Sequence, residues 1–146
     1  MAVVCCDTSF LFAFYGIDSL TGQAVAEVRH LSQSISVSIL NEFELENAIR
    51  FSVFRRAIDS SMATAMLADY ERDMRLGKLS LATCNLSAVL AEAKRLSIAH
   101  SQSGGHRAFD ILHVAAALHL GAREFLSFDA NQRKLAKAEG LKIRPV

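Results

Sequence analysis

The 146-residue sequence contains few cysteines, almost no net charge and no long hydrophobic run. Its three cysteines are Cys5, Cys6 and Cys84, an odd number without the spacing of metal ligands, so we expect small apolar residues in a reducing compartment. The formal net charge of +1 gives no overall attraction to nucleic acid. A polyanionic partner would therefore need a local basic patch or a metal ion.

No apolar segment approaches the length of a membrane span, and we expect no membrane contact. The apolar residues 1–6 are followed by Asp7 too early for a signal peptide, and no Lys or Arg precedes them. These features predict a cytoplasmic protein. Because 146 residues is the usual size of one domain and 51% of them are hydrophobic, residues 1–146 are predicted to form a single domain.

Strand-like and helix-like patterns alternate along the chain, which is typical of a mainly parallel α/β sheet covered by helices. The expected strands cover residues 3–6, 34–40, 79–83, 124–128 and 141–144. The expected helices cover residues 22–31, 41–51, 60–76, 87–98, 109–118 and 131–139. The Gly/Ser-rich residues 101–105 predict a loop over a functional edge.

Four acidic residues stand where an expected strand ends or an expected helix begins: Asp7, Glu44, Asp110 and Asp129. The carboxyl ends of parallel strands converge on one crevice, so these residues are expected to meet there. Carboxylates at close range repel one another, and a hard divalent cation such as Mg²⁺ or Mn²⁺ removes that cost. The pattern predicts a shared metal site.

Each acidic residue has a simpler explanation when it is taken alone. Asp7 and Asp129 could cap helices, and Glu44 could be an exposed helix charge. Asp110 could pair with Arg107, three residues before it. It is the joint occurrence of the four that favours a shared site.

Four segments resemble the PIN-domain family in sequence and in order: Asp-Thr-Ser-Phe-Leu at 7–11, Glu-Leu at 44–45, Arg-Ala-Phe-Asp-Ile-Leu-His-Val-Ala-Ala-Ala-Leu at 107–118 and Leu-Ser-Phe-Asp-Ala-Asn-Gln-Arg-Lys-Leu-Ala at 126–136. The chain is most similar to small bacterial PIN proteins related to VapC toxins of toxin–antitoxin pairs. The resemblance implies a three-layer α/β/α sandwich, Mg²⁺ or Mn²⁺ bound by the acidic residues, and endoribonuclease activity.

Matched to the family motifs, Asp7, Asp110 and Asp129 take the places of the family aspartates. The family glutamate is matched by Glu44, with Glu42 as the alternative. Residues two apart on a helix cannot both point into the site, so only one of these two can be the site glutamate. At position 127 the family commonly has threonine, and Ser127 can form the same hydrogen bond.

Other polar residues are candidates for supporting roles around the predicted metal site, or have simpler explanations. Thr8 and Ser9 are candidates to hydrogen-bond Asp7 or phosphate, and Arg107 is a candidate phosphate ligand. His113 is predicted to be a packed, hydrogen-bonded histidine. A solvated helical surface is the commoner explanation for the basic residues of the expected helices, which are Arg50, Arg55, Arg56, Arg133, Lys134 and Lys137.

The predicted function is metal-dependent hydrolysis of RNA by a VapC-like toxin. A non-catalytic PIN-fold module that binds RNA or protein is the alternative, and a phosphoacceptor receiver domain is disfavoured because Thr8 and Ser9 follow Asp7 where that family has further acidic residues. The expected partners are RNA, an antitoxin protein and a second copy of the chain. A homodimer is predicted through the apolar residues of the helix at 60–76, although core packing would also explain them.

Overall fold

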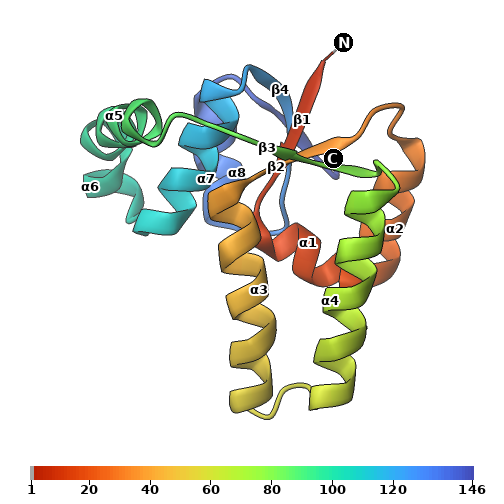
Figure 1. The fold of residues 1–146 in the computed structure, drawn as a ribbon. Coiled ribbons are helices and arrows are strands. Elements are labelled where there is room, and N and C mark those ends of the chain that lie inside the picture. Colours follow the sequence, from red (N-terminus) through yellow and green to blue (C-terminus); the bar gives the residue numbers. More distant parts are fainter. Residues whose placement is uncertain (1) are drawn as a thin grey trace.

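The computed structural model describes residues 2–146 and contains one five-stranded sheet (Figure 1). The strands are β1 (Val3–Cys6), β2 (Ile35–Ser38), β3 (Leu79–Ala82), β4 (Ala122–Leu126) and β5 (Lys142–Arg144). The helices are α1 (Thr8–Tyr15), α2 (Thr21–His30), α3 (Ile39–Phe54), α4 (Ser60–Arg75), α5 (Leu86–Leu96), the π-helix η1 (Ser97–Ser101), α6 (Gln102–Gly104), α7 (Ala108–His119) and α8 (Ala130–Ala138).

All five strands are parallel and lie in the order β3-β2-β1-β4-β5. The chain adds β2 and β3 on one side of β1 and then returns to add β4 and β5 on the other side. The strand order therefore reverses between β1 and β4, which is the point where parallel α/β sheets form their ligand crevice.

Helices cover both faces of the sheet because alternate strand residues point to opposite faces. Val4 and Leu126 belong to the core formed with α1, α2, α3 and α4, whereas Cys5 and Phe125 belong to the core formed with α5, α7 and α8. Strands buried on both faces must be apolar throughout, which explains the continuous apolar run of β1. The predicted three-layer α/β/α sandwich is confirmed.

Side-chain caps fix the starts of five helices. The capping side chains accept a hydrogen bond from a main-chain N–H three residues later, and they belong to Asp7, Ser38, Asp59, Asn85 and Asp129. Asp7 and Asp129 thus act as helix caps, which is the simpler role that each could have alone.

Three segments differ from the sequence-based prediction. Residues 8–15 form α1, a segment for which neither a helix nor a strand was predicted. Residues 101–105 were expected to be a loop, but the helical path continues through η1 and α6 until Gly105, whose φ of +65° reverses the chain. The fourth strand lies two residues earlier than expected, so Ser127 and Phe128 follow β4 rather than belong to it.

The apolar residues of α4 are absorbed by the core. Met66 and Tyr70 are buried, and Met62 and Leu67 pack against the same cluster. Core packing thus explains the feature on which the predicted dimer surface was based.

The cysteines and the helix lengths agree with the sequence analysis. All three cysteines are free; Cys5 and Cys6 are buried and Cys84 is partly buried. Across residues 2–146, no helix is both long and apolar enough to cross a membrane.

Candidate active site

The site lies at the carboxyl ends of β1 and β4, where the strand order reverses. Asp7 directly follows β1, and its main-chain N–H donates to the carbonyl oxygen of Leu126 at 3.0 Å. Ser127 and Asp129 follow β4 in the same region. The parallel pairing of β1 with β4 thus brings together residues that are 120 positions apart in the sequence.

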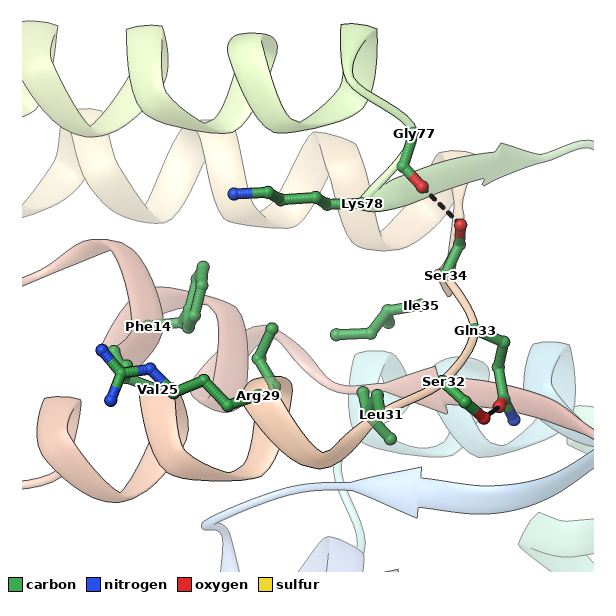
Figure 2. A pocket seen from close by; sticks show the side chains of 11 residues that line it. Phe14, Val25, Arg29, Leu31, Ser32, Gln33, Ser34, Ile35, Gly77 and Lys78 are labelled. Carbon is green, nitrogen blue, oxygen red and sulfur yellow. Dashed lines mark hydrogen bonds between the residues drawn. The ribbon is translucent and has the colours of Figure 1, made fainter.

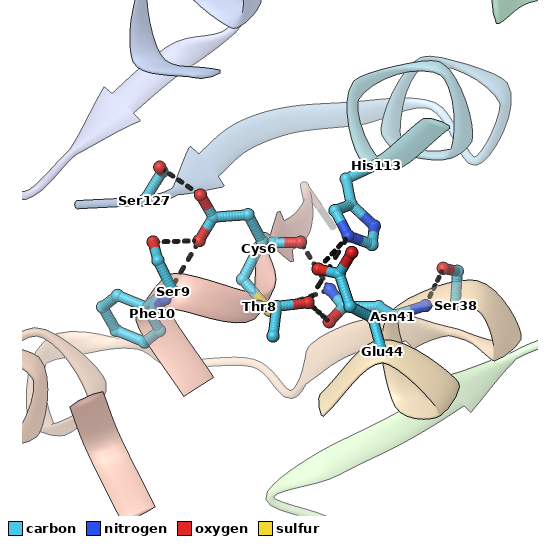
Figure 3. A network of polar contacts seen from close by, with 10 residues as sticks. Cys6, Thr8, Ser9, Phe10, Ser38, Asn41, Glu44, His113 and Ser127 are labelled. Atoms are coloured by element: carbon cyan, nitrogen blue, oxygen red, sulfur yellow. Dashed lines mark hydrogen bonds and ion pairs between the residues drawn. The ribbon is translucent and has the colours of Figure 1, made fainter. Parts of the chain in front are cut away.

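The Asp7 carboxylate is completely buried, and both of its oxygens accept hydrogen bonds from residues that are labelled in Figure 3. Its Oδ1 accepts from the Ser9 hydroxyl at 2.7 Å and from the Phe10 N–H at 2.9 Å, and its Oδ2 accepts a short hydrogen bond from Ser127. Burial raises the pKa of Asp7 from 3.8 to about 6, against the lowering effect of these hydrogen bonds. Asp7 is therefore held rigidly in an environment that disfavours its charge.

A second polar network joins α1, α3 and α7 (Figure 3). The Glu44 Oε1 lies 2.9 Å from the Nε2 of His113, which is also 3.4 Å from the Thr8 hydroxyl. Thr8 donates to the Oδ1 of Asn41 at 3.2 Å, and the Asn41 Nδ2 donates to the carbonyl oxygen of Cys6 at 2.7 Å. This network connects the start of α3 to the end of β1.

A hydrogen bond joins Glu44 and His113. Burial raises the pKa of Glu44, but the hydrogen bonds from His113 and Thr8 outweigh it, so that the pKa is lowered overall. The carboxylate therefore accepts a hydrogen bond from the Nε2–H of His113. The Nδ1 of His113 is buried and has no hydrogen-bond partner within residues 2–146.

Asp110 lies half-buried in the first turn of α7, within the electric field of the other acids. Burial raises its pKa, and the negative charges of Asp129 and Glu44 raise it further; the charges of His113 and Arg107 act in the opposite direction. No ion pair joins Asp110 to Arg107 among the side chains of residues 2–146. Asp129 and Glu44 are thus the carboxylates whose charges act on Asp110.

The two candidate glutamates point in different directions. Glu42 accepts a hydrogen bond from the Tyr70 hydroxyl at 2.8 Å, which turns it toward α4. Glu44 contacts His113 and acts on the pKa of Asp110. Glu44, and not Glu42, is therefore the glutamate whose charge acts on Asp110.

The donor chemistry of this region fits a hard divalent cation, because all four predicted ligands are carboxylates. Within residues 2–146, no group of three or more Asp, Glu, His or Cys side chains is arranged closely enough to hold an ion. Asp7 is engaged by Ser9 and Ser127, and Glu44 by His113. The predicted ligand set stays a prediction.

The supporting residues lie around these acids. Ser9 and Ser127 bind Asp7 directly, whereas Thr8 binds Asn41 and faces His113. Arg107 is exposed at the start of α7. The predicted packing of His113 is confirmed, since its ring is 2% exposed.

The sequence analysis did not predict that Asn41 belongs to this polar network, or that His113 contacts Glu44 and Thr8. Asn41 is 2% exposed in the first turn of α3, where an Asn usually indicates a helix cap. A polar residue on the buried side of an expected helix was the only available signal.

These features define a class of protein before any relative is considered: a parallel α/β domain in which Asp7 and Asp129 follow the two strands where the strand order reverses. A family model described as the PIN domain matches residues 4–138. The chain belongs to the PIN domain family. The resemblance found in the sequence is confirmed, and the receiver-domain alternative is set aside.

Solved structures share this fold along nearly the whole chain. VapC20 of Mycobacterium tuberculosis, a toxin that cleaves the sarcin–ricin loop, has a TM-score of 0.71 at 17% identity, covering 97% of this chain and 99% of that one. FitAcB of Neisseria gonorrhoeae has a TM-score of 0.68 at 14% identity, with coverage of 97% and 96%. VapBC2 of Rickettsia felis, bound to a DNA fragment from its promoter, has a TM-score of 0.65 at 14% identity, covering 97% of this chain and 97% of that one. No curated protein sequence matches the chain.

Proposed function

We propose that this protein is a metal-dependent endoribonuclease that hydrolyses RNA phosphodiester bonds in the cytoplasm as the toxin of a VapC-like toxin–antitoxin pair. The observation that carries the proposal is the effect of the Asp129 and Glu44 charges on the pKa of Asp110, in a fold whose buried Asp7 directly follows β1. Membership of the PIN family and the full-length structural match to an RNA-cleaving toxin support it.

In this proposal, Asp7, Glu44, Asp110 and Asp129 are the residues that would hold Mg²⁺ or Mn²⁺. Such an ion supplies a bound water of lowered pKa and stabilises the leaving oxygen of a phosphodiester. The protein itself positions the acids: Ser9 and Ser127 fix the two oxygens of Asp7.

Two further residues support the proposed site. His113 orients Glu44 by holding its Oε1. Arg107, exposed at the start of α7, is available to bind a substrate phosphate.

The activity is tested by incubating the purified protein with end-labelled structured RNAs, including a sarcin–ricin stem-loop, in Mg²⁺ or Mn²⁺. Cleavage should disappear with EDTA, and Asp110→Asn should lower the rate by more than about 100-fold, because even indirect partners of metal ligands cost 10–100-fold when they are lost. Glu44→Gln should lower it comparably, whereas Glu42→Gln provides the matched control and should retain most of the activity.

Different results would overturn different parts of this proposal. Cleavage that persists in EDTA or in the Asp110→Asn variant would assign the activity to a contaminant. Absence of both cleavage and calorimetric metal binding would favour the non-catalytic PIN-fold module. Equal losses in the Glu42 and Glu44 variants would remove the assignment of Glu44.

We propose an antitoxin protein and a second copy of this chain as partners. The similarity to VapBC2 supports an antitoxin partner, since VapBC2 is a complex of a toxin with its antitoxin.

For the homodimer, we propose the outer face of α3 in place of the α4 surface that was predicted from the sequence. Phe43, Phe51 and Phe54 are 63%, 51% and 80% exposed on this face, and the last two rings stack with centroids 5.8 Å apart. Clustered exposed apolar side chains of this kind commonly mark interaction surfaces.

The dimer is tested by size-exclusion chromatography with light scattering at micromolar concentration. The wild-type protein should elute as a dimer, and Phe54→Glu should yield a monomer because a charge is placed among the exposed rings. Leu76→Glu, at a residue that is 65% exposed at the end of α4, is the control and should stay dimeric. A monomeric wild-type protein would contradict the homodimer.

A further inference from the structure

One cavity lies away from the acidic edge, by which we mean the edge of the sheet where Asp7 and Asp129 follow β1 and β4. It has about 640 Å³ between the end of α2 and the turn before β3, near the amino ends of the strands (Figure 2). Phe14, Val25 and Leu31 give it apolar walls, and nothing in its lining connects it to the site. A groove beside α8 differs from it in both charge and position.

The groove beside α8, which we call the α8 groove, has a volume of about 650 Å³ and is lined by residues of α8 and of the final strand. Four of the lining side chains are cationic: Arg133, Lys134, Lys137 and Lys142. No acidic side chain lines it within residues 2–146. A chain with a net charge of only +1 thus concentrates positive charge in one groove.

Little negative charge neutralises this groove. Among residues 2–146, Lys134 and Lys137 have no ion-pair partner, and Arg133 uses its guanidinium to bind carbonyl oxygens rather than carboxylates. The Nζ of Lys142 lies 3.9 Å from Glu124, whose carboxylate is also paired with Arg144. Glu139, at the end of α8, is likewise paired with Arg95 and His100. At least two lysine charges therefore remain available to an anion.

The α8 groove starts at the acidic edge and runs away from it. Asp129, whose charge acts on Asp110, is the N-cap of α8. Arg133 donates from Nη1 to the carbonyl oxygen of Ser127 at 2.8 Å, and the Ser127 hydroxyl in turn holds Asp7. From Asp129 to Lys137 the helix rises about 12 Å, at 1.5 Å per residue. A linear polyanion lying in the groove would have one end at the acids.

We propose that the α8 groove binds the sugar–phosphate backbone of the RNA strand that flanks the cleaved bond. The inference rests on the proposed function and deepens it. Lysines act as point charges toward phosphate, and the groove has no aromatic ring to stack a base. The contact is therefore independent of sequence: it positions the RNA, while the choice of cleavage site is made elsewhere.

The test is RNA binding measured by fluorescence anisotropy over a series of KCl concentrations, with a labelled single-stranded RNA and proteins that carry Asp110→Asn to prevent cleavage. Adding Lys134→Ala and Lys137→Ala should weaken binding roughly tenfold at moderate salt. It should also reduce the slope of log K against log salt by about 1.4, since each lost phosphate contact removes about 0.7 for a single strand. Both lysines are exposed, so the fold should be retained, which circular dichroism checks.

The control removes two positive charges elsewhere. Arg29 and Arg75 are exposed at the ends of α2 and α4, close to the amino ends of the strands, and Arg29→Ala with Arg75→Ala should leave the affinity and the slope almost unchanged. If this control loses as much RNA affinity as the lysine variant, the effect is due to net charge alone, and the proposed role of the α8 groove is wrong.

The outcomes separate this inference from the nuclease proposal. If the wild-type protein cleaves RNA but the lysine variant binds RNA with unchanged affinity and salt slope, the proposed RNA contact of the α8 groove is wrong and the nuclease proposal is retained. If the lysine variant loses binding while the wild-type protein cleaves nothing, the groove stands and the nuclease is wrong. Failure of the Asp110→Asn protein to bind any RNA would overturn the groove as well.

Discussion

Asp7→Asn is expected to abolish RNA cleavage and also to stabilise the folded protein at neutral pH. Burial raises the pKa of this carboxyl group from 3.8 to about 6, so the folded state binds the proton more tightly than the unfolded state. The resulting stability is fully present below pH 3.8 and is lost as the pH rises through 6. A shift of this size corresponds to about 3 kcal/mol between the two limits.

Asparagine removes the buried charge but keeps most of the hydrogen bonds. Its carbonyl oxygen can accept from Ser9 and from the Phe10 N–H, whereas the bond from Ser127 must be rearranged at a cost of about 1 kcal/mol. The free energy of unfolding at pH 7.5 should therefore rise by about 1–2 kcal/mol, and the melting temperature by roughly 2–4 °C per kcal/mol for a chain of this size.

Thermal unfolding of the wild-type and Asp7→Asn proteins at pH 7.5 and pH 4.5 provides the measurement. The advantage of the variant should shrink or disappear at the lower pH, where Asp7 in the wild-type protein is protonated. Asp59→Asn is the control because Asp59 is an exposed cap of α4, and asparagine caps a helix equally well. A variant at Asp7 that is less stable by the same amount at both pH values would show that burial of this charge costs little.

Phe10→Ala is expected to destabilise the protein by about 3–5 kcal/mol, which is a large part of the stability of a typical domain. The Phe10 ring is completely buried in α1 and stacks on Phe128 with ring centroids 5.4 Å apart. Its main-chain N–H also holds Asp7. The substitution would open a cavity directly between the turn that carries Asp7 and the residue before Asp129.

Urea unfolding measures this loss, and Ile98→Ala is the matched control. The Ile98 side chain is 84% exposed, so its removal should change the free energy of unfolding by less than about 0.5 kcal/mol. A loss below about 1.5 kcal/mol for Phe10→Ala would show that the space left by the ring is filled by local collapse.

The strands, and the positions of Asp7 and Asp129 after β1 and β4, could be predicted because each of these acids stands where the hydrophobic pattern changes. Helix α1 could not, since Phe10, Leu11 and Ala13 are all buried and leave no 3.6-residue alternation of apolar and polar residues. Where a helix is covered on several sides, periodicity gives no signal. The Asp7 cap was the remaining indication of a helix start.

Side-chain directions were also beyond the sequence. Glu42 and Glu44 could not be separated by pattern, because the contact that turns Glu42 away comes from Tyr70, 28 residues later. The lysines of α8 resembled an ordinary solvated surface, and the groove became visible only when β5 placed Lys142 beside them. Contacts between distant elements decided both cases.

The strand pairing at the site also determines when activity can begin during synthesis. Asp7 is synthesised 120 residues before Ser127, and Asp129 and most of the pairing of β1 with β4 depend on the same later stretch of chain. Since the ribosome releases the chain from its amino end, Asp7 cannot meet these partners until they too have emerged. For the proposed ribonuclease, this order would delay activity and spare the messenger and the ribosome that are producing it.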